Sequence, residues 1–157
     1  MKKIAIFASG SGSNFQAILD VVKAGELEAD IALLVCDKPG AFAIERANAA
    51  HIPAFTFNPK EYSSKDAYEE VILEKLTSFG VEFIVLAGYM RLIGPTLLGK
   101  FSGRIVNIHP SLLPAFPGKD AIGQALAAKA EWSGITIHYV DEGMDTGPII
   151  AQERVRI

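Results

Sequence analysis

The sequence predicts an α/β fold: an open, doubly wound, mostly parallel sheet with helices on both faces. Short runs of Ile, Val, Leu and Phe alternate with segments whose apolar residues recur every three or four positions. Glycines separate the two kinds of segment, and no repeat or low-complexity tract interrupts the alternation. This order is typical of crossover-connected parallel strands, whose ligands bind beyond the carboxyl ends of the strands.

The first half of the chain supplies the predicted parallel strands and crossover helices. The apolar runs are typical of strands that helices cover on both faces, and they occupy residues 3–8, 31–36, 54–57 and 83–87. Helical spacing occupies residues 15–24, 41–50 and 65–78, with Gly25, Gly40 and Gly80 as boundaries.

The pattern changes after Gly94. We expect a short strand over 104–108, a helix over 121–130 and another strand over 135–140. Between them, residues 110–118 carry three prolines. Because proline fixes φ and removes a backbone donor, this loop is either a rigid binding segment or a plain surface connector, and the segment alone favours neither.

One domain over residues 1–157 is expected, because 50% hydrophobic and 21% charged residues can build one core of ordinary size. The longest uncharged apolar stretch, 83–90, is far shorter than the roughly 20 residues that cross a bilayer as a helix. The apolar run after Lys2 and Lys3 stops at Ser9, so no export signal is predicted.

Cysteine and charge content predict a cytoplasmic protein that acts on small molecules. Cys36 is the single cysteine, so no intramolecular disulfide is expected, which suits a reducing compartment. The net charge is −3, from 15 basic and 18 acidic residues that are interspersed along the chain. Neither nucleic acid nor an anionic membrane is therefore expected as a partner.

The glycine-rich segment SGSGSN at 9–14 joins the first strand directly to the first helix. Backbone N–H groups in such a loop, together with the amino end of the helix, suit a phosphate. Phe15 stands where a dinucleotide fingerprint needs a small residue, and the loop has no Walker lysine, so a single phosphate fits better. The alternative is a tight turn in which Ser13 or Asn14 only caps the helix.

In the run 104–109, side chains alternate between the two faces of a strand, so Asn107 and His109 share one face, and Pro110 ends the strand just beyond them. An amide can donate to a developing oxyanion, and an imidazole can exchange a proton near neutral pH, so the pair suits acyl transfer. A carboxylate from the loop 141–148 could orient the imidazole, and spacing alone leaves Asp141, Glu142 and Asp145 open. The competing interpretation of His109 is a structural ring held by backbone beneath the loop.

Other candidate residues carry weaker predictions. His51 ends a helix and His138 is an ordinary member of its strand, so neither has a special role. No metal-binding motif occurs, so no metal is predicted. Cys36 is interpreted as a small core residue. Asp37 could bond the ribose of a dinucleotide, which keeps a nicotinamide-dependent oxidoreductase or a noncatalytic nucleotide-binding module open.

Four segments together resemble one family over the whole chain: SGSGSN at 9–14, LAGYMRLI at 86–93, RIVNIHPSLLP at 104–114 and HYVDEGMDTGP at 138–148. The family is that of the phosphoribosylglycinamide formyltransferases of purine synthesis, which use 10-formyltetrahydrofolate as formyl donor. The resemblance implies a formyltransferase with a Rossmann-like fold, no metal, and phosphoribosylglycinamide and formyl folate as small-molecule partners. The expected oligomeric state is a monomer or a weak homodimer.

The resemblance also implies residue roles. The residues at the phosphoribosyl end of the substrate are Gly12, Ser13 and Asn14. Those of the folate site are Lys65, Met90, Arg91, Leu92, Ile93 and Asn107. The catalytic trio is Asn107, His109 and Asp145. In this scheme the substrate amine attacks the formyl carbon, Asn107 and protonated His109 stabilise the oxyanion, and Asp145 keeps the ring protonated.

Two further expectations come from comparison with the family. Formyltetrahydrofolate deformylases and the formyltransferases that act on methionyl-tRNA or sugar amines share the Asn, His and Asp residues, so they are the alternatives. The deformylases add an amino-terminal domain and the tRNA enzymes a carboxyl-terminal one, which makes both less favoured. The family's chains continue beyond Ile157 with another strand segment and a long helix. We therefore expect a chain of these residues alone to expose apolar surface, and to be less stable, to associate or to be inactive.

Overall fold

A seven-stranded sheet forms the centre of the computed structural model, which describes residues 1–143 and 145–157. Met144, a member of the segment 138–148, lies outside the described residues. The strand order is β3-β2-β1-β4-β5-β6-β7. Pairing is parallel from β3 across to β5 and antiparallel for β6 and β7. The predicted open, mostly parallel α/β sheet is confirmed. The strands are β1 (Lys2–Ala8), β2 (Ala29–Cys36), β3 (Ala54–Thr56), β4 (Phe83–Leu86), β5 (Ile105–His109), β6 (Trp132–Tyr139) and β7 (Ile149–Arg156).

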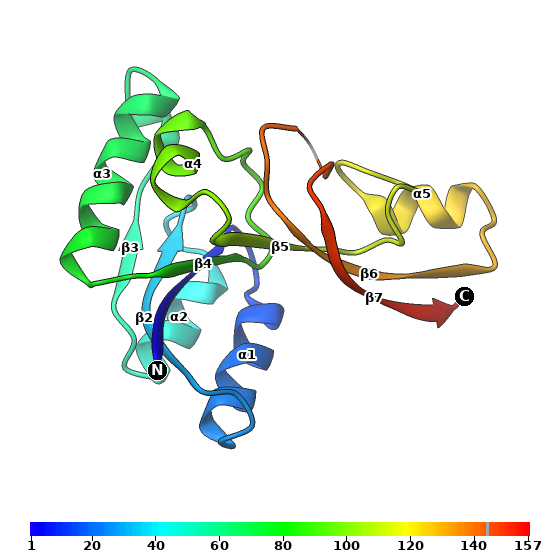
Figure 1. Cartoon of the computed structure of the whole chain (residues 1–157), viewed down its shortest axis with the longest axis horizontal. Helices are drawn as coiled ribbons and strands as arrows, with labels where there is room; N and C mark the ends of the chain where they lie inside the picture. The colour runs from blue at the N-terminus through cyan, green and yellow to red at the C-terminus, as the bar shows by residue number, and fades with distance from the viewer. Residues whose placement is uncertain (144) are drawn as a thin grey trace.

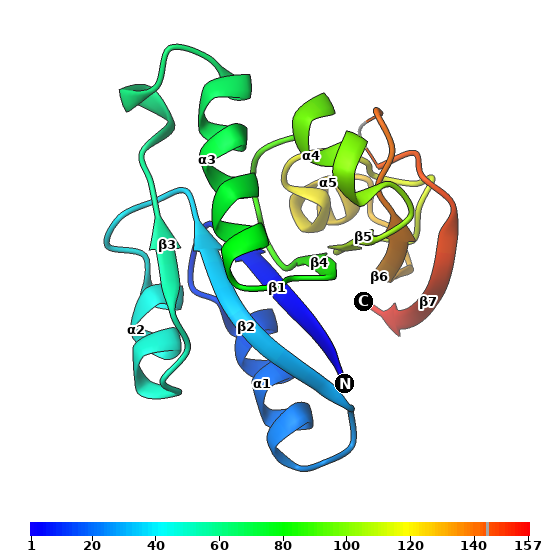
Figure 2. The ribbon, with the colours of Figure 1, turned by 60° about the vertical axis from the view of Figure 1, so that its left-hand side comes forward.

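Helices cover both faces of the parallel strands, as predicted. The sheet lies between two clusters of buried residues. One cluster contains residues of the strands, α1 and α2, and the other contains residues of the strands, α3 and α4. The two pairs of helices lie on opposite sides of β1 and β2 (Figures 1 and 2). The helices are α1 (Ser13–Lys23), α2 (Phe42–Ala49), the short 3-10 helix η1 (Pro59–Glu61), α3 (Lys65–Ser78), α4 (Pro95–Phe101) and α5 (Ala121–Ala127).

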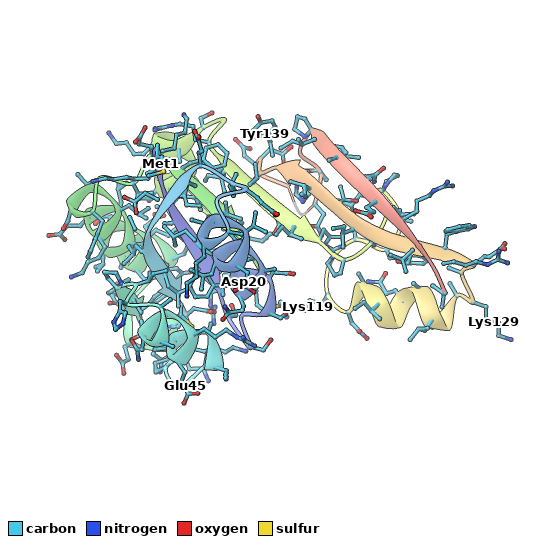
Figure 3. All side chains as sticks on the ribbon, turned by 90° about the horizontal axis from the view of Figure 1, so that it is seen from below. Met1, Asp20, Glu45, Lys119, Lys129 and Tyr139 are labelled. Carbon is cyan, nitrogen blue, oxygen red and sulfur yellow. The ribbon has the colours of Figure 1, made fainter. Side chains whose placement is uncertain are left out.

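Strands β6 and β7 extend with α5 beyond the helix-covered part of the sheet as an arm (Figure 1). Figure 3 shows Lys129 at the outer end of this arm and Tyr139 where β6 reaches the rest of the molecule. Every residue of β7 is exposed. The arm carries apolar side chains at its surface, among them Trp132, Ile149 and Val155.

The sheet order brings three strand ends together. β1 lies between β2 and β4, and β4 pairs with β5, all in parallel. The loops 9–12, 87–94 and 110–120, which follow β1, β4 and β5, therefore emerge at the same edge. This edge is where the sequence places its candidate residues. In the part of the chain that the structure describes, no helix is long and apolar enough to span a bilayer.

Candidate active site

The glycine loop ends at an open helix terminus. Gly12 is the N-cap of α1, with φ of 75°, and no described side chain caps this helix. The predicted alternative, in which Ser13 or Asn14 only caps the helix, is therefore wrong. Phe15 points away from the loop and is fully buried in the core. The first-turn N–H groups thus face a hollow of about 220 Å³, which suits an anion.

Lys38 lines the same hollow, although the sequence analysis did not select it. It comes after β2, whose end adjoins that of β1 in the sheet, and this adjacency is not visible in the spacing of Lys38 from the loop. Arg46 of α2 holds the loop in place, because its Nε donates to the carbonyl oxygen of Ser11 at 2.8 Å. A cation near the loop and a rigid backbone both favour phosphate binding.

Asn107, His109 and Asp145 meet at one carboxylate oxygen. Asp145 Oδ1 lies 3.4 Å from His109 Nδ1 and 3.5 Å from Asn107 Nδ2. Asp145 Oδ2 accepts a hydrogen bond from the backbone N–H of Gly118 at 2.7 Å, which fixes the orientation of the carboxylate. His109 is buried, and the Asp145 side chain is 10% exposed. The low polarity around the cluster strengthens its electrostatic contacts.

The other two carboxylates that spacing left open make no described ion pair with His109. Asp141 Oδ1 accepts from Thr146 Oγ1 at 2.8 Å and from Gly143 N at 2.9 Å. These hydrogen bonds, that of Thr146 first, lower the pKa of the Asp141 carboxyl. Glu142 faces a separate hollow beside α4. Of the three, only Asp145 lies within 4 Å of His109 among the described ion pairs.

The proline-rich loop is held rigidly, which favours the binding interpretation over a plain connector. Thr136 Oγ1 of β6 donates to the carbonyl of Ser111 at 2.6 Å and accepts from Leu113 N at 3.1 Å. The loop in turn holds the His109 ring, because His109 Nε2 lies 3.0 Å from the carbonyl oxygen of Phe116. This carbonyl only accepts, so Nε2 carries a proton.

His138 belongs to the cluster, although the sequence analysis gave it no special role. Its Nδ1 lies 2.8 Å from the carbonyl oxygen of Tyr139, an acceptor, so Nδ1 donates. In the neutral ring Nε2 is then an acceptor, and it lies 3.2 Å from Asn107 Nδ2. His138 therefore fixes which end of the Asn107 amide faces Asp145. The pairing of Asn107 with His138 across β5 and β6 produces this contact.

A second hollow, of about 330 Å³, continues from the glycine loop to the cluster. Both hollows share Asn14, Gly88 and Met90 on their walls. Asn107, His109 and Asp145 line the larger one, whose remaining walls are mostly apolar. The two hollows therefore adjoin, one at the predicted phosphate loop and the other at the predicted catalytic residues.

The residues of the predicted folate site differ in their exposure and in whether they line this larger hollow. Met90 and Leu92 expose their side chains, at 60% and 46%, whereas Ile93 is buried. Arg91 also lines the hollow, but its Nε donates to Asp37 at 3.0 Å. Lys65 is not among its lining residues, and its Nζ donates to the carbonyl of Leu92 at 2.8 Å. Lys65 thus supports the segment from α3.

Asp37 does not offer its carboxylate to a ligand. Its side chain is 1% exposed, with one oxygen bonded to Ser9 Oγ at 2.5 Å and the other to Arg91 Nε. Because both oxygens are occupied and buried, the predicted alternative of a ribose contact in a dinucleotide site is not favoured. Cys36, beside it, is fully buried at the end of β2, as predicted.

The comparison with protein families decides the identity of this fold. A formyl transferase family model matches residues 2–157. The chain belongs to the formyl transferase family. It is 62% identical over 157 residues to the phosphoribosylglycinamide formyltransferase of Bacillus subtilis, spanning 100% of this chain and 80% of that protein. The family predicted from the sequence is therefore confirmed.

Solved structures of formyl transferases superpose closely on this chain. The phosphoribosylglycinamide formyltransferase of Bacillus halodurans gives a TM-score of 0.97 at 60% identity, covering 99% of this chain and 80% of that one. Glycinamide ribonucleotide transformylase 1 of Geobacillus kaustophilus gives 0.97 at 64% identity, covering 100% and 84%. Within residues 1–143 and 145–157, no group of three or more His, Cys, Asp or Glu side chains is placed to hold a metal ion.

Proposed function

We propose that this formyl transferase moves a formyl group from 10-formyltetrahydrofolate to the amine of phosphoribosylglycinamide, a step of purine synthesis. The observation that carries the proposal is that the hollow at the open amino end of α1 adjoins the hollow lined by the Asn107–His109–Asp145 cluster. A phosphorylated amine that is anchored at the loop extends towards the cluster. The relatives named above carry the same activity in their names.

The phosphate end of the substrate binds at the glycine loop in this proposal. The first-turn N–H groups of α1, from Gly12 to Asn14, supply donors, and the helix dipole adds partial positive charge. Lys38 on the wall of this hollow adds a full charge. Such charge-assisted contacts are about twice as strong as neutral hydrogen bonds.

The folate binds in the larger hollow, between the segment 90–93 and the residues 135–141 of β6 and its following loop. Leu92, Ile93, Ile135 and Val140 give this space apolar walls on both sides, which suit a flat heteroaromatic ring. Asn107, His109 and Asp145 contribute polar groups to the same hollow. The formyl group of a folate bound in this way would lie beside Asn107, His109 and Asp145.

The residues of the cluster divide the chemistry between them. The substrate amine attacks the formyl carbon, the bond from that carbon to the folate nitrogen breaks, and one proton passes from the amine to the departing nitrogen. Asn107 donates to the oxyanion that forms on the way, and His109 carries the proton. Asp145 aligns the His109 ring and balances its charge.

His109 must exchange one of its protein contacts to reach the substrate, because both ring nitrogens face acceptors. The contact from Nε2 to Phe116 is 3.0 Å, and that from Nδ1 to Asp145 is 3.4 Å. A donor–acceptor distance of 3.4 Å exceeds the usual range for N–H···O bonds, so this contact is the weaker one.

An absorbance assay for tetrahydrofolate formation tests this function. Product should form from 10-formyltetrahydrofolate only when phosphoribosylglycinamide is present. Product at the same rate without the amine would instead indicate the alternative of a deformylase, in which water is the acceptor. We also propose a cytoplasmic location and a monomer or weak homodimer, which cell fractionation and sedimentation velocity test.

A further inference from the structure

Asp37 is a buried charged residue that the proposed chemistry does not use. It follows β2 directly, and its side chain is 1% exposed. Burying a carboxylate is costly unless hydrogen bonds and an opposite charge compensate it. Here both kinds of partner are present, and they come from two different loops of the active site.

One oxygen of Asp37 holds the start of the phosphate loop. Ser9 Oγ donates to Asp37 Oδ1 at 2.5 Å. Because a hydroxyl has a single proton, its lone pairs are then free to accept, and Ser9 Oγ accepts from Met90 N at 2.9 Å. The carboxylate thus fixes the hydroxyl in the orientation that joins the loop 9–12 to the folate segment. The backbone of Ser9 adds a second link, from its N–H to the carbonyl of Gly88 at 3.0 Å.

The other oxygen of Asp37 holds the folate segment directly. Arg91 Nε donates to Asp37 Oδ2 at 3.0 Å, and the Arg91 side chain is 38% exposed where it lines the larger hollow. The guanidinium also offsets the negative charge of Asp37, which would otherwise face a bound phosphate across Ser9. One carboxylate therefore orients a side chain in each of the two substrate loops.

We propose that Asp37 is a positioning residue that couples the two substrate pockets, so that occupancy of either pocket strengthens binding in the other. This inference rests on the proposed function for the identity of the two ligands. A ligand that orders one loop also orders the other through Ser9 and Arg91. Binding of the second ligand then costs less conformational entropy, because its loop is already ordered. By linkage, each ligand raises the affinity for the other by the same factor.

Isothermal titration calorimetry measures this factor. The dissociation constant of phosphoribosylglycinamide is determined alone and with saturating tetrahydrofolate, which lacks the formyl group and so permits no turnover. We expect the wild-type chain to bind the ribonucleotide about 5-fold or more tightly when the folate is present. Asp37→Asn keeps the shape but places an NH₂ group opposite Ser9 or Arg91, so the ratio should fall close to one.

Two further variants separate coupling from a loss of structure. Ser9→Ala removes the hydroxyl bridge and leaves the carboxylate, so it should reduce the ratio by itself, and it carries the test if Asp37→Asn does not fold. Asp30→Asn changes an exposed aspartate of the same strand, β2, and should keep the wild-type ratio. Asp37→Asn combined with Ser9→Ala should lower the ratio no further than Asp37→Asn alone.

The outcomes are distinct. A variant that weakens both ligands but retains the wild-type ratio would show that Asp37 only stabilises the fold, and would overturn the proposal. A wild-type ratio of one, with both ligands bound, would overturn it as well while leaving the proposed function intact. A wild-type chain that binds neither ligand would overturn both.

Discussion

Gly12→Ala tests the phosphate loop through its backbone. A Cβ on Gly12 would lie 2.8 Å from Ala43 Cβ and 2.9 Å from Ala43 Cα, so the loop or α2 has to move. The φ of 75° adds strain, because left-handed backbone costs an L residue about 1 to 2 kcal/mol. Overpacking adds about 1 to 3 kcal/mol. The free energy of unfolding should therefore fall by about 2 to 5 kcal/mol, which many domains survive.

Gly25→Ala is the matched control for this change. Its φ of 77° imposes the same strain, but no heavy atom lies within 4 Å of the added Cβ. Urea denaturation should therefore show a loss of only about 1 to 2 kcal/mol for Gly25→Ala. Because the movement at Gly12 turns the first N–H groups of α1, Gly12→Ala should also raise the KM for phosphoribosylglycinamide while leaving the KM for the folate near its wild-type value. Equal stability of the two variants, together with an unchanged KM in both, would show that Gly12 makes no close contact that the loop depends on.

Three further predictions concern titratable residues. His109→Ala and Asp145→Ala should each lower turnover by about 10²- to 10⁴-fold without loss of the circular dichroism signal of the fold. Burial raises the pKa of the Glu69 carboxyl above 4.5, so the folded chain retains a proton that the unfolded chain loses first. Stability should therefore fall as pH rises from that value through the raised pKa, and Glu69→Gln should flatten this fall in urea titrations. Burial also raises the pKa of the Cys36 thiol, so a maleimide should modify it only as fast as the chain unfolds.

Each of these predictions has a contrary result. Near wild-type turnover in both His109→Ala and Asp145→Ala would remove the proposed trio. For Glu69, the same pH slope in wild type and variant would show that its carboxyl is not the group responsible. Rapid labelling of Cys36 in a folded chain would contradict its burial.

The sequence predicts the helix-covered part of the fold well because both of its periodic signals are strong there. β1, β2, β4 and α3 begin and end within a few residues of their predicted ranges. α4 was missed because its seven residues include Gly99 and begin at Pro95, which hides the helical spacing. β7 was missed because all its residues are exposed and its centre is polar, so it shows no alternation. A strand with no buried face lacks the alternation of apolar and polar residues by which other strands are predicted.

The site was predictable where its residues belong to one strand. Asn107 and His109 share a face of β5, and the alternation of two shows this directly. Asp145 could not be chosen from spacing, because the choice depends on how the loop after β6 folds back towards Gly118. His138 was undervalued for a related reason, since its contact with Asn107 arises only from the pairing of β5 with β6. Contacts between residues of different strands can be predicted only when the order of the strands in the sheet is known, and the sequence alone does not give that order.

The same limit applies to Lys38 and Asp37, which follow β2. Their importance depends on β2 lying beside β1, where both reach the phosphate loop. The sequence offered Asp37 only as a ribose ligand, because its distance along the chain from the glycine loop fits that role. Its actual partners, Ser9 and Arg91, lie 28 and 54 residues away. The family resemblance implied roles for the loop residues, whereas the connections between loops required coordinates.

The most direct test of the central claim compares two amine substrates. The claim is that a phosphate held at the glycine loop positions the amine at the Asn107–His109–Asp145 cluster in the adjoining hollow. We predict that removing the phosphate from phosphoribosylglycinamide lowers kcat/KM by about 100-fold or more, since two hydrogen bonds to a charged group contribute about 3 kcal/mol or more. Equal kcat/KM for the phosphorylated and the dephosphorylated amine would contradict the claim.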